Sequence, residues 1–264
     1  MSSPNDGDLE KYFEEGARKL STVDVGRASH AGSSKFDKDY WKIRGTSHKA
    51  HVLAPKNPKK SAEAVLQIFK HPDKWRFDCS EWIQVLSHYA WLKVLGRDEF
   101  NRRVQTRPRG LEIKPFHSSV FTIRKHYYRR EKKWQEMLYY PNGEMARGYV
   151  TGLTDAEILA SAPVGTRVGF KSEVGQGATA YENTLKIGKN RFAAHWLQGE
   201  DDYKTVFDLE ELLRRIYTMD GDQDEDDPIS WIRDKVWIRE IAFFRGMPGG
   251  VPLPKPSPLS ASGA

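Results

Sequence analysis

The longest apolar segment of the chain runs from Ser80 to Leu95. Its sixteen residues contain neither Pro nor Gly, and apolar side chains would fall on every face of a helix built from them. A helix with so little polar surface is buried in a protein core. Gly96 follows directly and is a typical helix terminator. The pattern therefore predicts a central helix around which the chain is organised.

Shorter segments with helical or strand-like periodicity lie on both sides of this helix. Helices are predicted over 8–20, 61–69, 96–101 and 205–218, and 154–157 resembles a capping box at the start of another. Alternating segments bounded by turn residues predict a hairpin over 40–53, a strand within 163–170, and a second hairpin with strands at 181–187 and 191–197. Helices combined with antiparallel hairpins predict an α+β fold.

The 264 residues suffice for one large domain with a full hydrophobic core. We expect that domain to cover residues 36–245. Residues 1–35 read as a polar extension with one helix and a Gly/Ser-rich end, and residues 246–264 as a disordered tail rich in Pro, Gly and Ser.

Composition excludes several classes of protein. Aromatic residues make up 12% of the chain, which argues for a packed body and against disorder. A single cysteine excludes a disulfide framework and Cys-based zinc or iron–sulfur sites. No stretch approaches the roughly 20 apolar residues of a membrane span. The first residues lack the basic and apolar regions of a secretory signal, so we expect synthesis as a cytoplasmic protein.

The charge pattern adds two candidate sites. The net charge of +6 reflects 42 basic and 36 acidic residues, a mixed surface. The basic run 124–133, interleaved with aromatic residues, is compatible with nucleic-acid binding, but a solvated surface explains it more simply. The acidic segment 220–227 suggests calcium, yet Glu225 and Trp231 stand where an EF-hand loop needs Gly and Glu. No metal or cofactor site is predicted.

The single cysteine, Cys79, stands at the start of the predicted central helix. Asp78 and Ser80 are both good N-cap residues, so Cys79 should lie at or just before the first turn. A helix N-terminus favours thiolate over thiol, which predicts a depressed pKa and a nucleophilic cysteine. This stretch alone is equally compatible with a small buried hydrophobic residue.

The downstream hairpin supplies partners for such a nucleophile. Glu182 and His195 are thirteen residues apart, and a turn at 188–191 would bring them close together at the open end, facing one side. Taken singly, His195 is also compatible with a structural core histidine and Glu182 with a surface carboxylate.

Two segments together resemble a known family. The cysteine segment with its helix and the following Gly96–Asn101 resembles the corresponding stretch of bacterial spore-coat transglutaminases. Glu182-Asn183, Gly188 and then Phe192-Ala193-x-His195 resemble their active-site hairpin, with the same separation of Glu and His. The resemblance covers roughly residues 36–200, with a longer 111–160 region here.

This resemblance implies a papain-like core of the NlpC/P60 type and a protein-glutamine γ-glutamyltransferase that requires neither calcium nor a cofactor. It assigns Cys79 as nucleophile, Glu182 as activating carboxylate and His195 as the active-site histidine, whose role as base or support stays open. Asp78 stands where the family has Glu. The implied partners are proteins with Gln and Lys side chains, and the implied setting is sporulation, with the spore surface or non-classical export as destinations.

The expected reaction is a two-step acyl transfer through a thioester on Cys79. Backbone N–H groups at the start of the helix would hold the oxyanion. Trp75, Trp82 and Trp196 flank the site in sequence and are candidates for a tunnel that excludes water, although packing around the helix is an equal alternative. A papain-like amidase or deamidase, in which water resolves the thioester, is the first alternative, and a non-enzymatic nucleic-acid-binding protein is the second.

Overall fold

The computed structural model spans the whole chain, and the described residues are 6–25, 35–47, 50–106, 110–113, 121–128, 133–139, 145–151, 159–160, 162–174, 181–195, 203–219, 224 and 226–244. The predicted helix start at 154–157, Trp196, most of the acidic segment and the tail lie outside these ranges.

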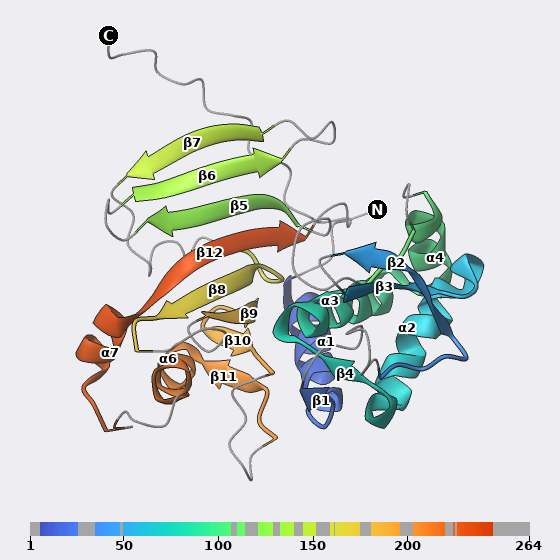
Figure 1. The fold of residues 1–264 in the computed structure, drawn as a ribbon, viewed down its shortest axis with the longest axis horizontal. Coiled ribbons are helices and arrows are strands. Elements are labelled where there is room, and N and C mark those ends of the chain that lie inside the picture. Colours follow the sequence, from blue (N-terminus) through green and yellow to red (C-terminus); the bar gives the residue numbers. More distant parts are fainter. Residues whose placement is uncertain are drawn as a thin grey trace.

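The helices are α1 (Asp6–Lys19), α2 (Ser61–Lys70), α3 (Cys79–Leu95), α4 (Arg97–Gln105), α6 (Leu209–Thr218) and α7 (Ile229–Lys235), with 3₁₀ turns η1 (Pro58–Lys60) and η2 (Pro72–Lys74). Helices α1 to α4 gather on one side of the molecule, and a large sheet with α6 and α7 packed against it forms the other side (Figure 1). The central helix is where the apolar pattern predicts it, and the hairpin over 40–53 is confirmed as β2 (Trp41–Ser47) and β3 (Ala50–Pro55).

An eight-stranded antiparallel sheet has the order β11-β10-β9-β8-β12-β5-β6-β7. Its strands are β5 (Phe121–Tyr128), β6 (Lys133–Tyr139), β7 (Met145–Thr151), β8 (Arg167–Ser172), β9 (Tyr181–Gly188), β10 (Arg191–Ala193), β11 (Val206–Asp208) and β12 (Val236–Phe244). A separate parallel pair joins β1 (Asp24–Val25) to β4 (Arg76–Phe77). The fold is thus a mixture of helices and mainly antiparallel strands, as the sequence predicts.

Two predicted boundaries are wrong. The strand expected at 191–197 ends at Ala193, so His195 follows β10 instead of lying within it. The helix expected from 205 begins at Leu209, because Val206–Asp208 pair with β10 and Asp208 caps the helix by accepting a hydrogen bond from Glu211 N at 2.9 Å. The first half of the basic run 124–133 forms part of a strand, because residues 124–128 belong to β5.

Two hydrophobic clusters cover the two faces of the sheet around β9. Alternation along the strands sends Leu185 and Ile187 into the cluster formed with α1 to α4. Val168 and Phe170 of β8 join α6 and α7 on the other face. Strand β9 is therefore buried between helical layers, which is why almost all of its residues are inaccessible to solvent.

The helix expected in an N-terminal extension is part of the main core. Leu9, Phe13 and Ala17 of α1 are buried in the same cluster as α3. Gly16 allows the close approach of the two helices, because a Cβ there would lie 2.5 Å from Leu86 Cδ1 and 3.0 Å from Tyr89 Cδ1.

Gly16→Val is accordingly expected to destabilise the protein by about 2 kcal/mol through overpacking between α1 and α3. Urea denaturation with a fluorescence readout measures the change in unfolding free energy. Gly45→Val is the matched control, since a Cβ at that exposed strand position meets no atom within 4 Å. Equal effects of the two substitutions would contradict close packing at Gly16.

Candidate active site

Cys79 is the first residue of α3, and the residues around it explain why the helix begins there. Asp78 is the N-cap: its Oδ1 accepts a hydrogen bond from Glu81 N at 2.7 Å, and its own N–H donates to Glu81 Oε2 at 3.2 Å. This reciprocal pair is the capping box that fixes helix starts. This capping box uses the N–H groups of Asp78 and Glu81. The N–H groups of Cys79 and Ser80 lie in the first turn, where a helix provides no acceptor of its own.

Strand β9 brings a carboxylate and an amide to the half-buried thiol. Asn183 Nδ2 donates to Cys79 Sγ at 3.1 Å. Arg167 Nη1, from the neighbouring strand β8, donates to Asn183 Oδ1 at 2.5 Å and so sets the orientation of the amide. Glu182 is 2% exposed and lies near enough to influence the ionisation of Cys79. Asn183 thus contacts the sulfur atom of a residue 104 positions earlier in the chain.

The electrostatics of the thiol differ from the sequence prediction. Burial raises the pKa of Cys79, and the negative charges of Glu182 and Asp78 raise it further, while the hydrogen bonds from Asn183 act in the opposite direction. The predicted depression of the thiol pKa by the helix N-terminus is therefore wrong for the resting protein. Two nearby carboxylates and desolvation outweigh the effect of the helix.

The pKa of the Glu182 carboxyl group is also shifted from its ordinary value. Burial is the largest cause that raises its pKa well above the usual value, and the charge of Asp78 adds to it. A carboxyl group with a raised pKa next to a thiol with a raised pKa is suited to accept and return a proton during catalysis.

His195 lies in a different environment from the one predicted. Its Nε2 donates to the backbone oxygen of Val23 at 3.0 Å, and its ring stacks on Trp82 with centroids 5.6 Å apart. Burial lowers its pKa to about 4, so the ring is neutral at physiological pH. No hydrogen bond within the described part of the chain joins it to Cys79 or Glu182. The register of β9 with β10, continued by two residues, places it opposite Asn183 instead of Glu182.

The tryptophans predicted to flank the site are buried. Trp75 is packed against Phe77 and Trp41, with ring centroids 5.2 Å and 5.6 Å away, and Trp82 lies beneath His195. Both indoles are inaccessible to solvent and belong to the core. Packing, the alternative to a tunnel, accounts for their positions, and Trp196 is outside the described residues.

Several buried polar atoms of this region have no hydrogen-bond partner in the described structure. They are Ser80 Oγ, Glu182 Oε1, His195 Nδ1 and the indole nitrogens of Trp75 and Trp82. Such atoms are rare in native proteins and concentrate where a substrate or catalysis needs them. Their presence around Cys79 marks this region as the candidate site.

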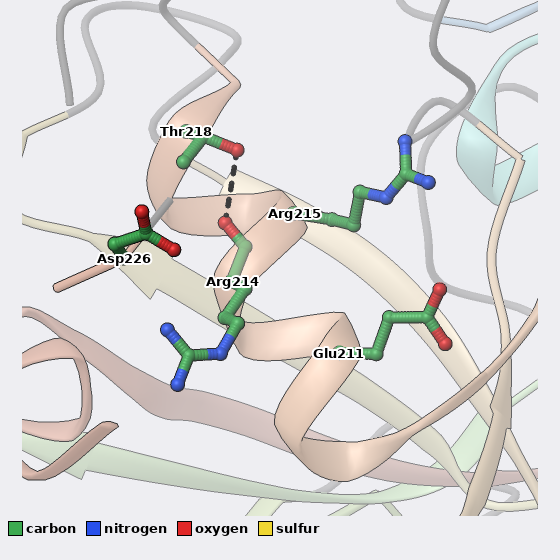
Figure 2. Close-up of a pocket in the computed structure, with 5 residues that line it drawn as sticks. All are labelled: Glu211, Arg214, Arg215, Thr218 and Asp226. Atoms are coloured by element: carbon green, nitrogen blue, oxygen red, sulfur yellow. Dashed lines mark hydrogen bonds between the residues drawn. The ribbon is translucent and has the colours of Figure 1, made fainter. Parts of the chain in front are cut away.

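A polar hollow of ≈ 450 Å³ occurs elsewhere, on the outer face of α6 (Figure 2). Its lining consists of Glu211, Arg214, Arg215, Thr218 and Asp226. Acidic and basic side chains balance in it, and none of the residues around Cys79 contributes to it.

Asn183 and Arg167 are the site residues that the sequence did not single out. Asn183 stood within the quoted hairpin motif but had no assigned role. Arg167 carried no signal, because only the pairing of β8 with β9 brings its side chain to Asn183.

We expect Asn183→Ala to lower kcat/KM about tenfold to a hundredfold, because it removes the hydrogen bond to Sγ. Asn183→Asp should lower kcat/KM further. It adds a third carboxylate beside the thiol, whose pKa is already raised by Glu182 and Asp78. Asn190→Ala, at the exposed hairpin turn, is the control. Steady-state kinetics with a Gln donor and an amine acceptor give the ranking, and equal activity of the two Asn183 variants would contradict this role.

A thiol at the start of a buried helix, with a carboxylate and an amide supplied by an antiparallel strand, defines a thiol enzyme of the acyl-transfer class. Comparisons with known proteins indicate which kind of acyl-transfer enzyme the chain resembles. Residues 12–140 match the family model of protein-glutamine gamma-glutamyltransferase. The match includes Cys79 and ends before Glu182.

A solved structure, "Transglutaminase from Geobacillus stearothermophilus (without C-terminal extension)", has a similar fold. The TM-score is 0.53 with 13% sequence identity, over 91% of this chain and 94% of that one. No curated protein sequence matches the chain. Residues 12–140 thus correspond to a protein-glutamine gamma-glutamyltransferase domain, which supports acyl transfer of the transglutaminase type as the activity. The solved structure supports the fold. None of its described helices has the length and apolar character needed to cross a bilayer.

Proposed function

We propose that this chain forms Gln–Lys isopeptide bonds through a thioester on Cys79, without calcium, on a papain-like core of the NlpC/P60 type. The observation that carries the proposal is the hydrogen bond of Asn183 to a thiol at a helix start, together with the influence of the neighbouring buried carboxylate, Glu182, on the ionisation of that thiol.

In the first step, Cys79 Sγ attacks the γ-carboxamide carbon of a peptide-bound Gln while Glu182 accepts the thiol proton. The oxygen becomes an oxyanion, and the backbone N–H groups of Cys79 and Ser80 are placed to donate to it. Collapse of the intermediate breaks the C–N bond, and Glu182 returns the proton to the departing nitrogen, which leaves as ammonia. The raised pKa of Glu182 favours both transfers, because a more basic carboxylate takes up a proton more readily before returning it.

In the second step, the neutral ε-amine of a Lys attacks the thioester carbon. Glu182 accepts a proton from the amine and returns it to the departing sulfur, so the enzyme is restored and the isopeptide released. His195 supports this geometry: it is neutral, stacks on Trp82 of α3 and fixes the N-terminal segment through Val23. The Trp82 ring, buried beneath the site, helps to keep water from the thioester.

We further propose a spore-coat type of cross-linking enzyme, which acts during sporulation on proteins assembled in the compartment where it is made or on the spore surface. The resemblance of the cysteine segment and of the hairpin around Glu182 supports this setting.

The test is incorporation of a fluorescent primary amine into casein in a buffer that contains a calcium chelator. We expect incorporation by the untreated protein and none after alkylation of Cys79 with iodoacetamide, with protein alkylated in the presence of excess Gln donor as the protection control. Release of ammonia without incorporation of the amine would replace the proposal by a deamidase. Incorporation that survives full alkylation would exclude Cys79 as the nucleophile.

A further inference from the structure

A strip of cationic and aromatic side chains extends from the nucleophile across the sheet. We define it by Tyr181 of β9, Lys171 of β8, and Trp237 and Arg239 of β12. Lys171 is the register partner of both Tyr181 and Trp237, so these three side chains share one face. Strands β9, β8 and β12 lie side by side in Figure 1.

The strip is continuous with the catalytic site. Asn183 follows Tyr181 by two residues and therefore points to the same face. Side chains at positions i and i+2 of a strand are separated by about 6.6 Å, and neighbouring strands by about 4.8 Å. A substrate segment that places its Gln at Cys79 therefore reaches Tyr181 and Lys171 with the two or three residues beside that Gln.

The arrangement of the strip depends on a glycine. Tyr181 lies across Gly169, where a Cβ would be 2.2 Å from the tyrosine hydroxyl oxygen. The guanidinium of Arg239 stacks over the Tyr181 ring, with Arg239 Cζ 5.1 Å from the ring centroid. Lys171 Nζ is likewise 5.8 Å from the Trp237 ring centroid. Both cations are thus held above aromatic rings, where the rings position them.

Both cations also remain available for an anionic partner. Within the described residues, no carboxylate forms an ion pair with Lys171 or Arg239. The nearby Lys235, in contrast, is paired with Glu173 at 3.1 Å. Arg239 is exposed, and Tyr181, Lys171 and Trp237 are partly exposed. A positively charged, accessible surface next to a nucleophile complements a negatively charged substrate segment.

We propose that the strip binds the residues that flank the acyl-donor Gln and selects proteins in which those residues are Asp or Glu. The inference rests on the proposed function and names its donor substrate class. Lys171 and Arg239 contact the flanking carboxylates, and Tyr181 and Trp237 contact the apolar parts of the same segment.

The test compares three Gln donors with one fluorescent amine acceptor. The first is a peptide with the sequence of residues 219–228 of this chain, in which Gln223 lies between acidic residues. The second is the same peptide with every Asp and Glu replaced by Ser, and the third is carbobenzoxy-Gln-Gly. We expect kcat/KM to be about tenfold higher for the acidic peptide than for the Ser peptide, with most of the difference in KM.

Arg239→Glu and Lys171→Glu should each lower that ratio about fivefold or more, as expected for like charges on a binding surface. Arg233→Glu is the matched control, because Arg233 is an exposed arginine of α7 outside the strip. An unchanged ratio in both strip variants, or no preference in the wild-type protein while carbobenzoxy-Gln-Gly is used, would overturn the inference. Failure with all three donors would instead overturn the proposed function.

Discussion

Replacing Glu182 by Gln is expected to slow amine incorporation about a thousandfold and, at the same time, to make Cys79 react faster with iodoacetamide. The first effect follows because general acid–base groups contribute about 10²–10⁴-fold to a reaction rate. The second follows because the Glu182 carboxylate is one of the causes that raise the thiol pKa, so its removal increases the fraction of thiolate. The substitution therefore lowers the rate of amine incorporation and raises the rate of alkylation.

This pair of measurements separates a catalytic Glu182 from a merely structural one. A loss of structure would also move the midpoint of alkylation to lower pH, because burial is the largest cause of the raised thiol pKa. Removal of the charge is therefore recognised by a lower midpoint in a variant that still unfolds cooperatively in urea. Cys79→Ala gives the background of both assays. Glu173→Gln, at the exposed position directly after β8, is the control for the loss of one carboxylate. If alkylation of the Glu182 variant kept the wild-type pH profile, the carboxylate would not influence the nucleophile.

Stability gives an independent readout of the same substitution. A carboxyl group whose folded pKa lies above its unfolded value stabilises the fold fully below the unfolded pKa, and this contribution is lost as pH rises through the folded pKa. Glu182 is such a group, because burial and the charge of Asp78 raise its pKa in the folded protein. Glu182→Gln should therefore unfold at a higher urea concentration than the wild type at pH 8 and show less difference at pH 4. The wild-type protein retains a destabilising carboxylate because the chemistry requires it.

The local features of the site follow from sequence, and the long-range ones do not. The apolar run from Ser80 and the cap at Asp78 predicted both the helix and the position of Cys79, because each depends on residues within one turn. The hairpin that carries Glu182 was predicted for the same reason. The ionisation of the thiol was not, since it depends on burial and on a carboxylate about a hundred positions away.

Side-chain partners across the sheet escaped prediction entirely. Arg167 meets Asn183 through the β8–β9 register, and His195 meets Val23 across 172 positions. The hairpin prediction placed His195 near Glu182, but an irregularity between Arg191 and Phe192 shifts the pairing, and β10 ends early. A shift of one residue in a hairpin is enough to change which side chains face each other.

His195 is expected to make the fold sensitive to acid, which His195→Gln should relieve. Its folded pKa of about 4 lies below the unfolded value of 6.5, because the buried ring is neutral. Such a group contributes stability that is present above the unfolded pKa and is lost as pH falls through the folded one. Between pH 7 and pH 4, the wild-type protein should therefore lose about 3 kcal/mol of unfolding free energy through this residue.

Urea denaturation at half-unit pH steps measures this loss, and the comparison is between slopes and not absolute stabilities. His195→Gln can still donate to Val23 O but has no ring to protonate, so its slope over this range should be shallower by about 3 kcal/mol in total. His71→Gln, at the partly exposed end of α2, controls for the loss of one imidazole. Identical slopes for the wild type and His195→Gln would mean that the pKa of His195 in the folded protein is close to its unfolded value. His195 would then regain the role of general acid that its burial and its bond to Val23 argue against.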